Sequence, residues 1–272
     1  MDEIQIKEMV RARYGSIADA DQSCCGPAAS GGTPADKSRQ MGYSPAELAA
    51  VPEGANLGLG CGNPQAIAAM QPGEVVVDLG SGAGFDCFLA AEQVGPTGRV
   101  IGVDMTHEML KKARDNAANI GAPNVEFRLG ELEHLPIADN TADVVISNCV
   151  INLVPDKAQV FREAFRVLKP GGRLAVSDVV NTAPLSAELQ ADPALLCGCV
   201  AGAAAVGKVE AWLKEAGFGN VRVTPRPESR EMIATWAPGS GIEDYVVSAT
   251  VEARKPNAGD TVACCAPSCC AE

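Results

Sequence analysis

Long apolar runs are lacking in this 272-residue sequence, although 47% of its residues are apolar. No stretch approaches the roughly 18 residues that a membrane span needs. The amino-terminal stretch MDEIQIKEMVRARYG is charged and amphipathic and lacks the apolar centre of a signal peptide. We therefore expect a cytoplasmic protein without a membrane partner.

Positive charge is also scarce, with 22 Lys and Arg against 34 Asp and Glu and a net charge of −12. Nucleic-acid backbones and anionic membrane surfaces both select clustered Lys and Arg, so we expect neither as a partner. The length and the apolar content are sufficient for a sizeable core. Nothing in the sequence demands an oligomer, and we expect a monomer.

The usual patterns of zinc proteins are missing as well. The sequence has two histidines, and its 11 cysteines include no C-x-x-C pair, so a tetrahedral zinc site of the usual spacing is not expected. In a reducing cytoplasm, cysteines serve catalysis or ion binding more often than disulfides. The question is which of the eleven do so.

Four regions are predicted from composition and periodicity. Residues 1–45 begin with a helix and continue into a flexible, Cys-containing segment rich in Gly and Pro. Residues 46–181 alternate β-branched apolar runs with helical patterns. Residues 182–256 are mainly helical and end in two strands that close the sheet, and residues 257–272 are a disordered Cys-rich tail.

The alternation of strands and helices predicts an α/β fold. The strand candidates before residue 182 are EVVVDLG, RVIGVD, NVEFRLG, ADVVISN and GRLAVSDVV. Between the second and third, a helix is expected from the N-cap Thr106 to the stop at Gly121. We expect a Rossmann-like, mostly parallel, doubly wound sheet with an antiparallel closing strand and a helical substrate-binding region.

A glycine loop follows the first strand in VVVDLGSGAGFD. Its spacing, Gly80-x-Gly82-x-Gly84, is one residue short of the dinucleotide pattern, and no Walker lysine follows it. Taken alone, the loop is weak evidence for a ligand site, because a tight strand-to-helix turn also explains it. Asp78 ends the same strand and Asp104 ends the next one, at the edge where doubly wound sheets bind ligands and where a carboxylate accepts hydrogen bonds from ribose hydroxyls.

Four motifs in succession, VVVDLGSGAGFD, VIGVDM, GELEHLP and VLKPGGRLAVSD, resemble those of class I S-adenosylmethionine-dependent methyltransferases over about residues 72–181. The resemblance implies S-adenosylmethionine as cofactor, with the glycine loop near its methionine part and the residues after the second and third strands near its ribose and adenine. Glu131 stands where aspartate is commoner and is expected near the adenine amine. The expected cofactor-binding residues are Asp78, Gly80, Ser81, Gly82, Gly84, Asp104, Met105, Glu131, Leu132 and Asn148.

Three cysteines lie in segments that we expect to meet at that edge. Cys61 lies in a Gly-rich loop where a thiol has no core to fill, Cys149 follows the fourth strand, and Cys199 lies in the added helical segment. Judged singly, each is explained about equally well by packing, and Cys87 is expected to be packing. Together, three thiols suit a soft, three-coordinate ion.

The segments NLGLGCGNP, SNCVINLVPDK, CVAGA and YVVSATVEARK are together similar to the arsenite methyltransferases, over about residues 42–255. This resemblance implies that Cys61, Cys149 and Cys199 bind trivalent arsenic, and that arsenite or methylarsenite, arriving as thiol conjugates, is methylated for detoxification. It implies a fourth, upstream cysteine that pairs with Cys61 during the redox cycle, for which Cys24 and Cys25 both qualify. It also implies an external reductant such as thioredoxin or glutathione.

Two other functions stay open at this point. A quinone- or sterol-type methyltransferase normally needs a base near the methyl group. Residues 148–205 offer only acidic residues in no recognisable catalytic motif: Asp156, Glu163, Asp178, Glu188 and Asp192. A non-catalytic, thiol-rich binder of soft metals would have no use for the cofactor motifs. The paired cysteines of the tail are either bait for soft ions or dispensable.

Overall fold

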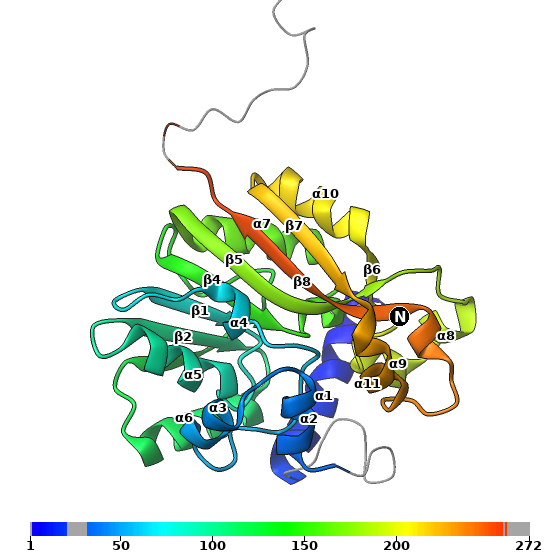
Figure 1. Ribbon diagram of the computed structural model, residues 1–272, viewed down its shortest axis with the longest axis horizontal. Coiled ribbons are helices and arrows are strands. Elements are labelled where there is room, and N and C mark those ends of the chain that lie inside the picture. Colours follow the sequence, from blue (N-terminus) through cyan, green and yellow to red (C-terminus); the bar gives the residue numbers. More distant parts are fainter. Residues whose placement is uncertain (1, 21–31, 258, 260–272) are drawn as a thin grey trace, which may run out of the picture.

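The computed structural model describes residues 2–20, 32–257 and 259, and it contains one eight-stranded mixed sheet with helices on both faces (Figure 1). The strand order is β3-β2-β1-β4-β5-β8-β7, with β6 paired to β5. The parallel core strands are β1 (Val75–Leu79), β2 (Arg99–Asp104), β3 (Val125–Leu129), β4 (Ala142–Asn148) and β5 (Leu168–Asn181), and β6 (Ala204–Ala205) is also parallel to β5. The expected α/β, Rossmann-like sheet is confirmed.

The closing strands run antiparallel, as expected. Strand β8 (Val246–Arg254) pairs antiparallel with β5 on one side and with β7 (Gly219–Arg226) on the other. Chain order reverses beside β1, which lies between β2 and β4. Such a reversal opens a crevice at the carboxyl ends of the strands, and that crevice positions the site.

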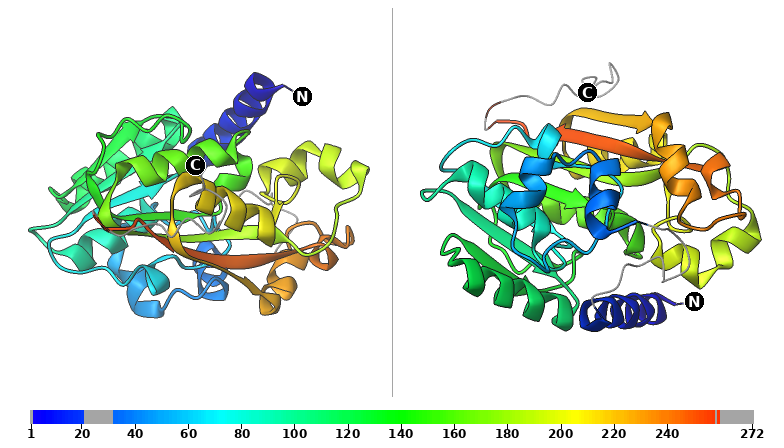
Figure 2. Two further views of the ribbon diagram at one scale, coloured as in Figure 1. Left: turned by 90° about the horizontal axis from the view of Figure 1, so that it is seen from above. Right: turned by 60° about the horizontal axis from the view of Figure 1, so that its bottom comes forward.

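Helices cover both faces of the sheet, as the two views of Figure 2 show, and their apolar side chains pack against it. On one face, α7 (Lys157–Val167) and α10 (Val206–Ala216) bury residues such as Phe161 and Leu213. On the other, α4 (Gln65–Ala68), α5 (Phe85–Val94) and α6 (His107–Ile120) bury residues such as Leu110. Helix α6 lies between Thr106 and Gly121, as predicted.

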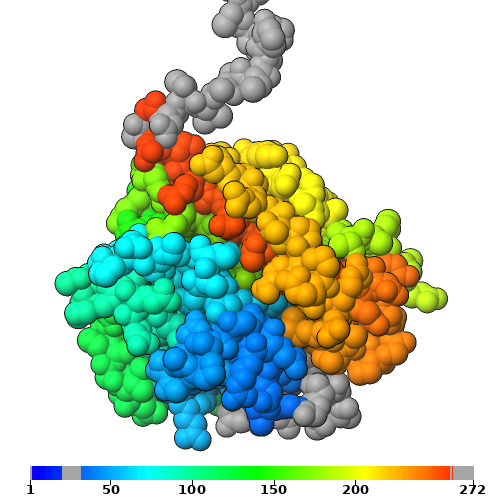
Figure 3. Space-filling model, viewed as in Figure 1, coloured from blue at the N-terminus to red at the C-terminus, as the bar shows by residue number. Residues whose placement is uncertain are grey.

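Additional elements surround the carboxyl ends of the strands. Helix α1 (Glu3–Ala20) packs against α6, α9 (Pro193–Cys197) and the 3-10 turn η1 (Ile151–Leu153). In Figure 3, the segment containing α2 (Pro34–Gln40) and α3 (Pro45–Ala50), in blue, lies beside the orange segment that contains α11 (Arg230–Ala234). The remaining short elements are α8 (Ala187–Ala191), η2 (Pro227–Ser229) and η3 (Ile242–Asp244).

Three local expectations are wrong. Residues 34–40 form α2 and are not a flexible loop, because Thr33 and Asp36 make a reciprocal capping box at its start. The fifth strand was expected to begin with GRLAVSDVV at Gly172, but β5 begins at Leu168 and so includes the KPGG segment, where the register with β4 shifts. Cys199 lies in a turn after α9 and not in a helix.

Cys24, Cys25 and the cysteines of the tail lie outside the described residues. Among the described helices, none combines the length and apolarity of a membrane span.

Candidate active site

A cavity of about 1030 Å³ lies at the carboxyl ends of the central strands. The glycine loop and the end of β2 line one part of it, and the segments around Cys149 and Cys199 line another. Helix α1, α2 and the segment around Trp236 complete the wall. A single cavity therefore joins most of the expected cofactor residues to Cys149 and Cys199, two of the three expected thiols.

The glycine loop leaves room for a ligand. Gly80 has a φ of +73°, and a Cβ there would lie 2.5 Å from Val150 Cγ2. Above Gly82 the space is open, since the nearest atom to a Cβ would be Met109 Sδ at 4.0 Å. Ser81 Oγ is buried and has no hydrogen-bond partner within the described chain. Ser81 lines the cavity although its hydroxyl lies against Gly102, so a rotation of this side chain toward a bound ligand would give the hydroxyl a partner.

Asp104 lies where a ribose-binding carboxylate is expected. It accepts hydrogen bonds from the backbone N–H groups of Gly82 at 3.0 Å and Thr106 at 2.8 Å, and it lines the cavity. Burial raises the pKa of Asp104, and these hydrogen bonds partly oppose the rise. The carboxylate thus has a fixed orientation and remaining acceptor capacity for hydroxyl groups.

Asp78 is buried below the loop. Burial, followed by the charge of Asp86, raises the pKa of Asp78 well above its usual range. Cys87 is fully buried and its Sγ donates a hydrogen bond to Asp78 Oδ2 at 3.2 Å, so its expected packing role is confirmed and includes a polar contact. A positively charged ligand group in the cavity would favour the ionised form of these carboxylates.

Two of the expected cofactor residues do not line the cavity. A Cβ at Gly84 would lie 2.8 Å from Phe88 and 2.9 Å from Phe127, so the glycine allows α5 to pack closely against the sheet. The Glu131 carboxylate pairs with Lys7 at 2.7 Å and Arg11 at 3.6 Å. The hydrogen bond from Lys7 lowers the pKa of Glu131.

Glu133, two residues further along, was not singled out from the sequence. It lines the cavity together with Leu132, and it pairs with Lys7 at 3.0 Å. The GELEHLP motif contains both glutamates, so only the path of the loop after β3 distinguishes the one that faces the cavity.

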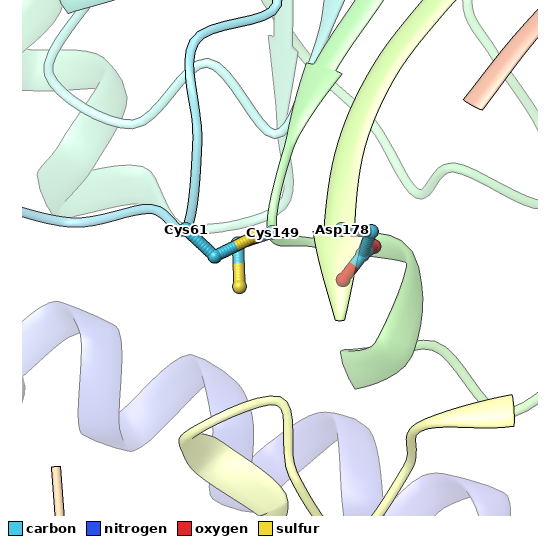
Figure 4. A group of neighbouring side chains, drawn as sticks. All are labelled: Cys61, Cys149 and Asp178. Carbon is cyan, nitrogen blue, oxygen red and sulfur yellow. The ribbon is translucent and has the colours of Figure 1, made fainter. Parts of the chain in front are cut away.

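Two of the three expected cysteines, Cys149 and Cys199, line the other part of the cavity, and the third, Cys61, is buried beside Cys149 and does not line it. The Sγ atoms of Cys61 and Cys149 and a carboxylate oxygen of Asp178 all lie within 4.8 Å of one another (Figure 4). Cys199 Sγ donates a hydrogen bond to the Cys149 carbonyl at 2.8 Å. Hydrogen bonds to the Cys199 and Cys61 thiols, together with burial, raise the pKa of Cys149 well above its usual range.

Cys61 does have a core around it, which corrects the expectation from the sequence. It is 2% exposed and belongs to an apolar cluster with Leu153, Val179 and Ile233. Its carbonyl accepts a hydrogen bond from Ser248 Oγ at 2.7 Å. Burial in an apolar cluster and proximity to a second thiol therefore coexist at this residue.

Asn148 holds the Cys61 loop against the end of β4. Its Oδ1 accepts the Cys61 N–H at 3.0 Å, and its Nδ2 donates to the Gly62 carbonyl at 2.8 Å and to Tyr43 Oη at 3.0 Å. Tyr43 in turn donates to Asp86 at 2.8 Å. Asn148 lines the cavity, as its expected cofactor role requires, but its amide is already engaged in positioning Cys61.

Comparisons with known proteins identify the family. Residues 70–217 match the family described as "Methyltransferase domain". The chain is a class I S-adenosylmethionine-dependent methyltransferase. It is 55% identical over 269 residues to the arsenite methyltransferase of Halobacterium salinarum, covering 95% of this chain and 69% of that protein. It belongs to the arsenite methyltransferase family.

Two further comparisons are shorter or more distant. The arsenite methyltransferase of Aquipseudomonas alcaligenes is 45% identical over 162 residues, which cover 57% of this chain and 47% of that protein. The crystal structure of an arsenic(III) S-adenosylmethionine methyltransferase from Chlamydomonas reinhardtii superposes with a TM-score of 0.60 at 31% identity, covering 84% of this chain and 75% of the other.

Proposed function

We propose that this protein methylates trivalent arsenic, as arsenite or methylarsenite, and so detoxifies it. The observation that carries the proposal is that Cys149 and Cys199 line one part of the cavity whose other part is the glycine loop and Asp104. The Cys61 Sγ is buried within 4.8 Å of the Cys149 Sγ, and Cys199 Sγ donates a hydrogen bond to the Cys149 carbonyl. Thiolates are the soft ligands that arsenic prefers over carboxylate or imidazole. All of these residues come from one chain, which supports a monomer as the working unit.

Binding of arsenite to the three thiols needs no net proton release. As each As–S bond forms, an As–O bond breaks, and the thiol proton leaves with the hydroxyl group as water. A thiol conjugate exchanges in the same way, with the proton leaving on the departing thiol. Such an exchange suits Cys149 and Cys199, because their environments raise the pKa values of both thiols.

The ligand arrangement sets the direction of attack. Three sulfurs on one side of arsenic leave its lone pair on the opposite side, and we propose that this side faces the cofactor. S-adenosylmethionine, when bound, supplies an electrophilic methyl group on a sulfonium. Holding two reacting atoms about 3–3.5 Å apart in line can contribute roughly 7–11 kcal/mol. Arsenic carries no proton to remove, so the residues around it need no general base.

We propose that the cofactor is held by Asp78, Gly80, Ser81, Gly82, Asp104, Met105 and Leu132, all of which line the cavity. Gly84 and Glu131 would contribute through the start of α5 and through the contact with α1. In this division, residues 46–181 bind the cofactor and residues 182–256 contribute the third thiol and close the sheet.

Turnover also needs a reductant. Methylation formally raises arsenic to the pentavalent state, and two electrons must return it to the trivalent state before the next methyl transfer. We propose that Cys61 and either Cys24 or Cys25 supply these two electrons to arsenic by forming a disulfide. Thioredoxin or glutathione then reduces the disulfide back to two thiols. The two upstream cysteines are adjacent in the sequence, and the proposal prefers neither.

The test is a product assay with purified, reduced protein, arsenite, a thioredoxin system and methyl-labelled S-adenosylmethionine. We expect label in methylated arsenic species separated by chromatography. Binding of S-adenosylmethionine without methylated arsenic, or transfer of the label to a quinone instead, would overturn the proposal.

A further inference from the structure

Asp178 is the feature of the thiol cluster that a three-thiol arsenic site does not use. Its carboxylate lies with the Cys61 and Cys149 thiols, all ligand atoms being within 4.8 Å (Figure 4). We propose that Cys61, Cys149 and Asp178 form a binding site for a borderline divalent cation such as Zn²⁺, and that this cation competes with trivalent arsenic for the two thiols.

The spacing is close to that of a zinc site. With Zn–S bonds of about 2.3 Å and Zn–O bonds of about 2.1 Å, tetrahedral ligand atoms lie about 3.5–3.8 Å apart. The ligand atoms of Cys61, Cys149 and Asp178 lie within 4.8 Å of one another, so they need to approach one another by about 1 Å at most. Small side-chain rotations are sufficient for this. The three ligands come from three separate segments, which explains why no zinc pattern is visible in the sequence.

Asp178 is held as a preformed ligand. It is 6% exposed, and its Oδ1 accepts hydrogen bonds from Asn152 Nδ2 at 2.9 Å and from the Val179 N–H at 2.7 Å. Its Oδ2 accepts the Ile151 N–H at 3.0 Å. A carboxylate oxygen can accept two bonds, so Oδ2 retains capacity for an ion. Such outer contacts fix a ligand's orientation and strengthen metal binding.

The two ions prefer different ligands within the cluster. Trivalent arsenic selects the softest ligands and therefore needs Cys199 and not Asp178. Zn²⁺ accepts sulfur and oxygen together, and therefore needs Asp178 and tolerates water in place of Cys199. Both ions need Cys61 and Cys149, so they exclude each other.

Lys157 is the positive charge that opposes a cation here. It donates to the Val154 carbonyl at 2.9 Å and is electrostatically coupled to Asp178 and Cys199. Its proximity predicts moderate rather than tight zinc binding. Replacement Lys157→Met should therefore tighten binding of the divalent cation.

The experiment titrates the reduced, full-length protein with Co²⁺, whose thiolate charge-transfer bands report on sulfur ligation, and then displaces it with Zn²⁺. Because the chain has 11 cysteines, the informative quantity is the difference between the wild type and matched variants. We expect Asp178→Asn to weaken Co²⁺ and Zn²⁺ binding by about tenfold or more and to change arsenite binding little. We expect Cys199→Ser to show the opposite pattern.

Two measurements keep the outcome decisive. The first is binding of S-adenosylmethionine, which shows whether each variant is folded. The second uses the wild type alone, in which one equivalent of arsenite must displace one Co²⁺ per chain. Equal Zn²⁺ affinity in the wild type and Asp178→Asn, or failure of arsenite to displace Co²⁺, would overturn the inference. The Co²⁺ readout does not depend on methyl transfer, so it stands apart from the test of the proposed function.

Discussion

Two of the three thiols are held on an unusual backbone. Cys149 and Cys199 have φ angles of 59° and 64°, in the left-handed region. For a residue with a Cβ this conformation costs about 1–2 kcal/mol, so packing alone would be served better by glycine at either place. The Cys149 N–H donates to the Ser177 carbonyl at 2.8 Å, which helps hold the conformation. Strain of this kind is typical of functional residues.

At Cys199, replacement by serine removes a soft ligand and leaves a similar volume. We predict that Cys199→Ser lowers arsenite methylation by at least about 100-fold, more than the usual loss from a supporting contact, while affinity for S-adenosylmethionine is retained. Product speciation and calorimetry measure the two effects. Cys197→Ser, two residues away, is the matched control and should keep most of the activity. Full activity in Cys199→Ser would rule out the three-thiol site.

At Asn148, the structure suggests a positioning role for a residue that the sequence assigned to the cofactor. We predict that Asn148→Ala weakens arsenite binding about tenfold, because the side-chain hydrogen bonds that hold Cys61 and Gly62 are lost. Affinity for S-adenosylmethionine should change less. Parallel titrations with both ligands decide the matter, and a larger loss for the cofactor would restore the original assignment.

At the scale of elements, the apolar periodicity and the placement of glycines were sufficient to predict the strands of the sheet. The core strands and α6 were predictable because their apolar patterns and stop signals are local properties of the chain. Helix α2 was missed because its Pro, Asp, Lys and Ser read as loop, although Thr33 and Asp36 carry a capping signal. Glu133 and Asp178 were not assigned to the site because their roles depend on how loops and distant segments pack.

Helix α1 is tied to the cofactor part of the cavity by ion pairs. Lys7 contacts Glu131 and Glu133, and α1 residues including Val10 and Tyr14 line the cavity. We predict that Lys7→Met weakens S-adenosylmethionine binding by about two- to fivefold, since partly exposed ion pairs contribute about 1 kcal/mol or less. The effect should shrink in high salt.

Calorimetric titration at two salt concentrations measures this effect. Lys111→Met is the matched control, because Lys111 makes an exposed ion pair with Asp115 outside the cavity wall. Equal losses in Lys7→Met and Lys111→Met would show that the anchoring of α1 is irrelevant to cofactor binding.

At the scale of the whole molecule, buried carboxylates cluster around the cavity. Burial raises the pKa values of Asp78, Asp86, Asp104 and Asp178, in the last case from 3.8 to about 6. Each carboxyl binds its proton more tightly in the folded than in the unfolded chain. Each of these carboxyls therefore stabilises the folded protein fully at a pH below its pKa in the unfolded chain. That stabilisation is lost as the pH rises through its pKa in the folded protein.

We predict that the ligand-free protein is more stable at pH 5 than at pH 7.5. The raised pKa of Asp178 contributes about 1.4 kcal/mol to this difference, because part of its full effect is already lost between its unfolded pKa and pH 5. Carboxyl groups with lowered pKa values, such as Glu163, lose their contribution only at lower pH. Thermal unfolding at both pH values measures the effect, and Asp178→Asn should reduce it. Greater stability at pH 7.5 than at pH 5 would contradict the conclusion that burial raises the pKa values of these carboxyls.

We propose above all that trivalent arsenic is held by the thiols of Cys61, Cys149 and Cys199. X-ray absorption at the arsenic edge, on full-length protein loaded with one equivalent of arsenite, tests it most directly. We predict three sulfur neighbours and no oxygen in the wild type, and two sulfurs with one oxygen in Cys199→Ser. An oxygen neighbour in the wild type, or an unchanged three-sulfur shell in Cys199→Ser, would contradict the claim.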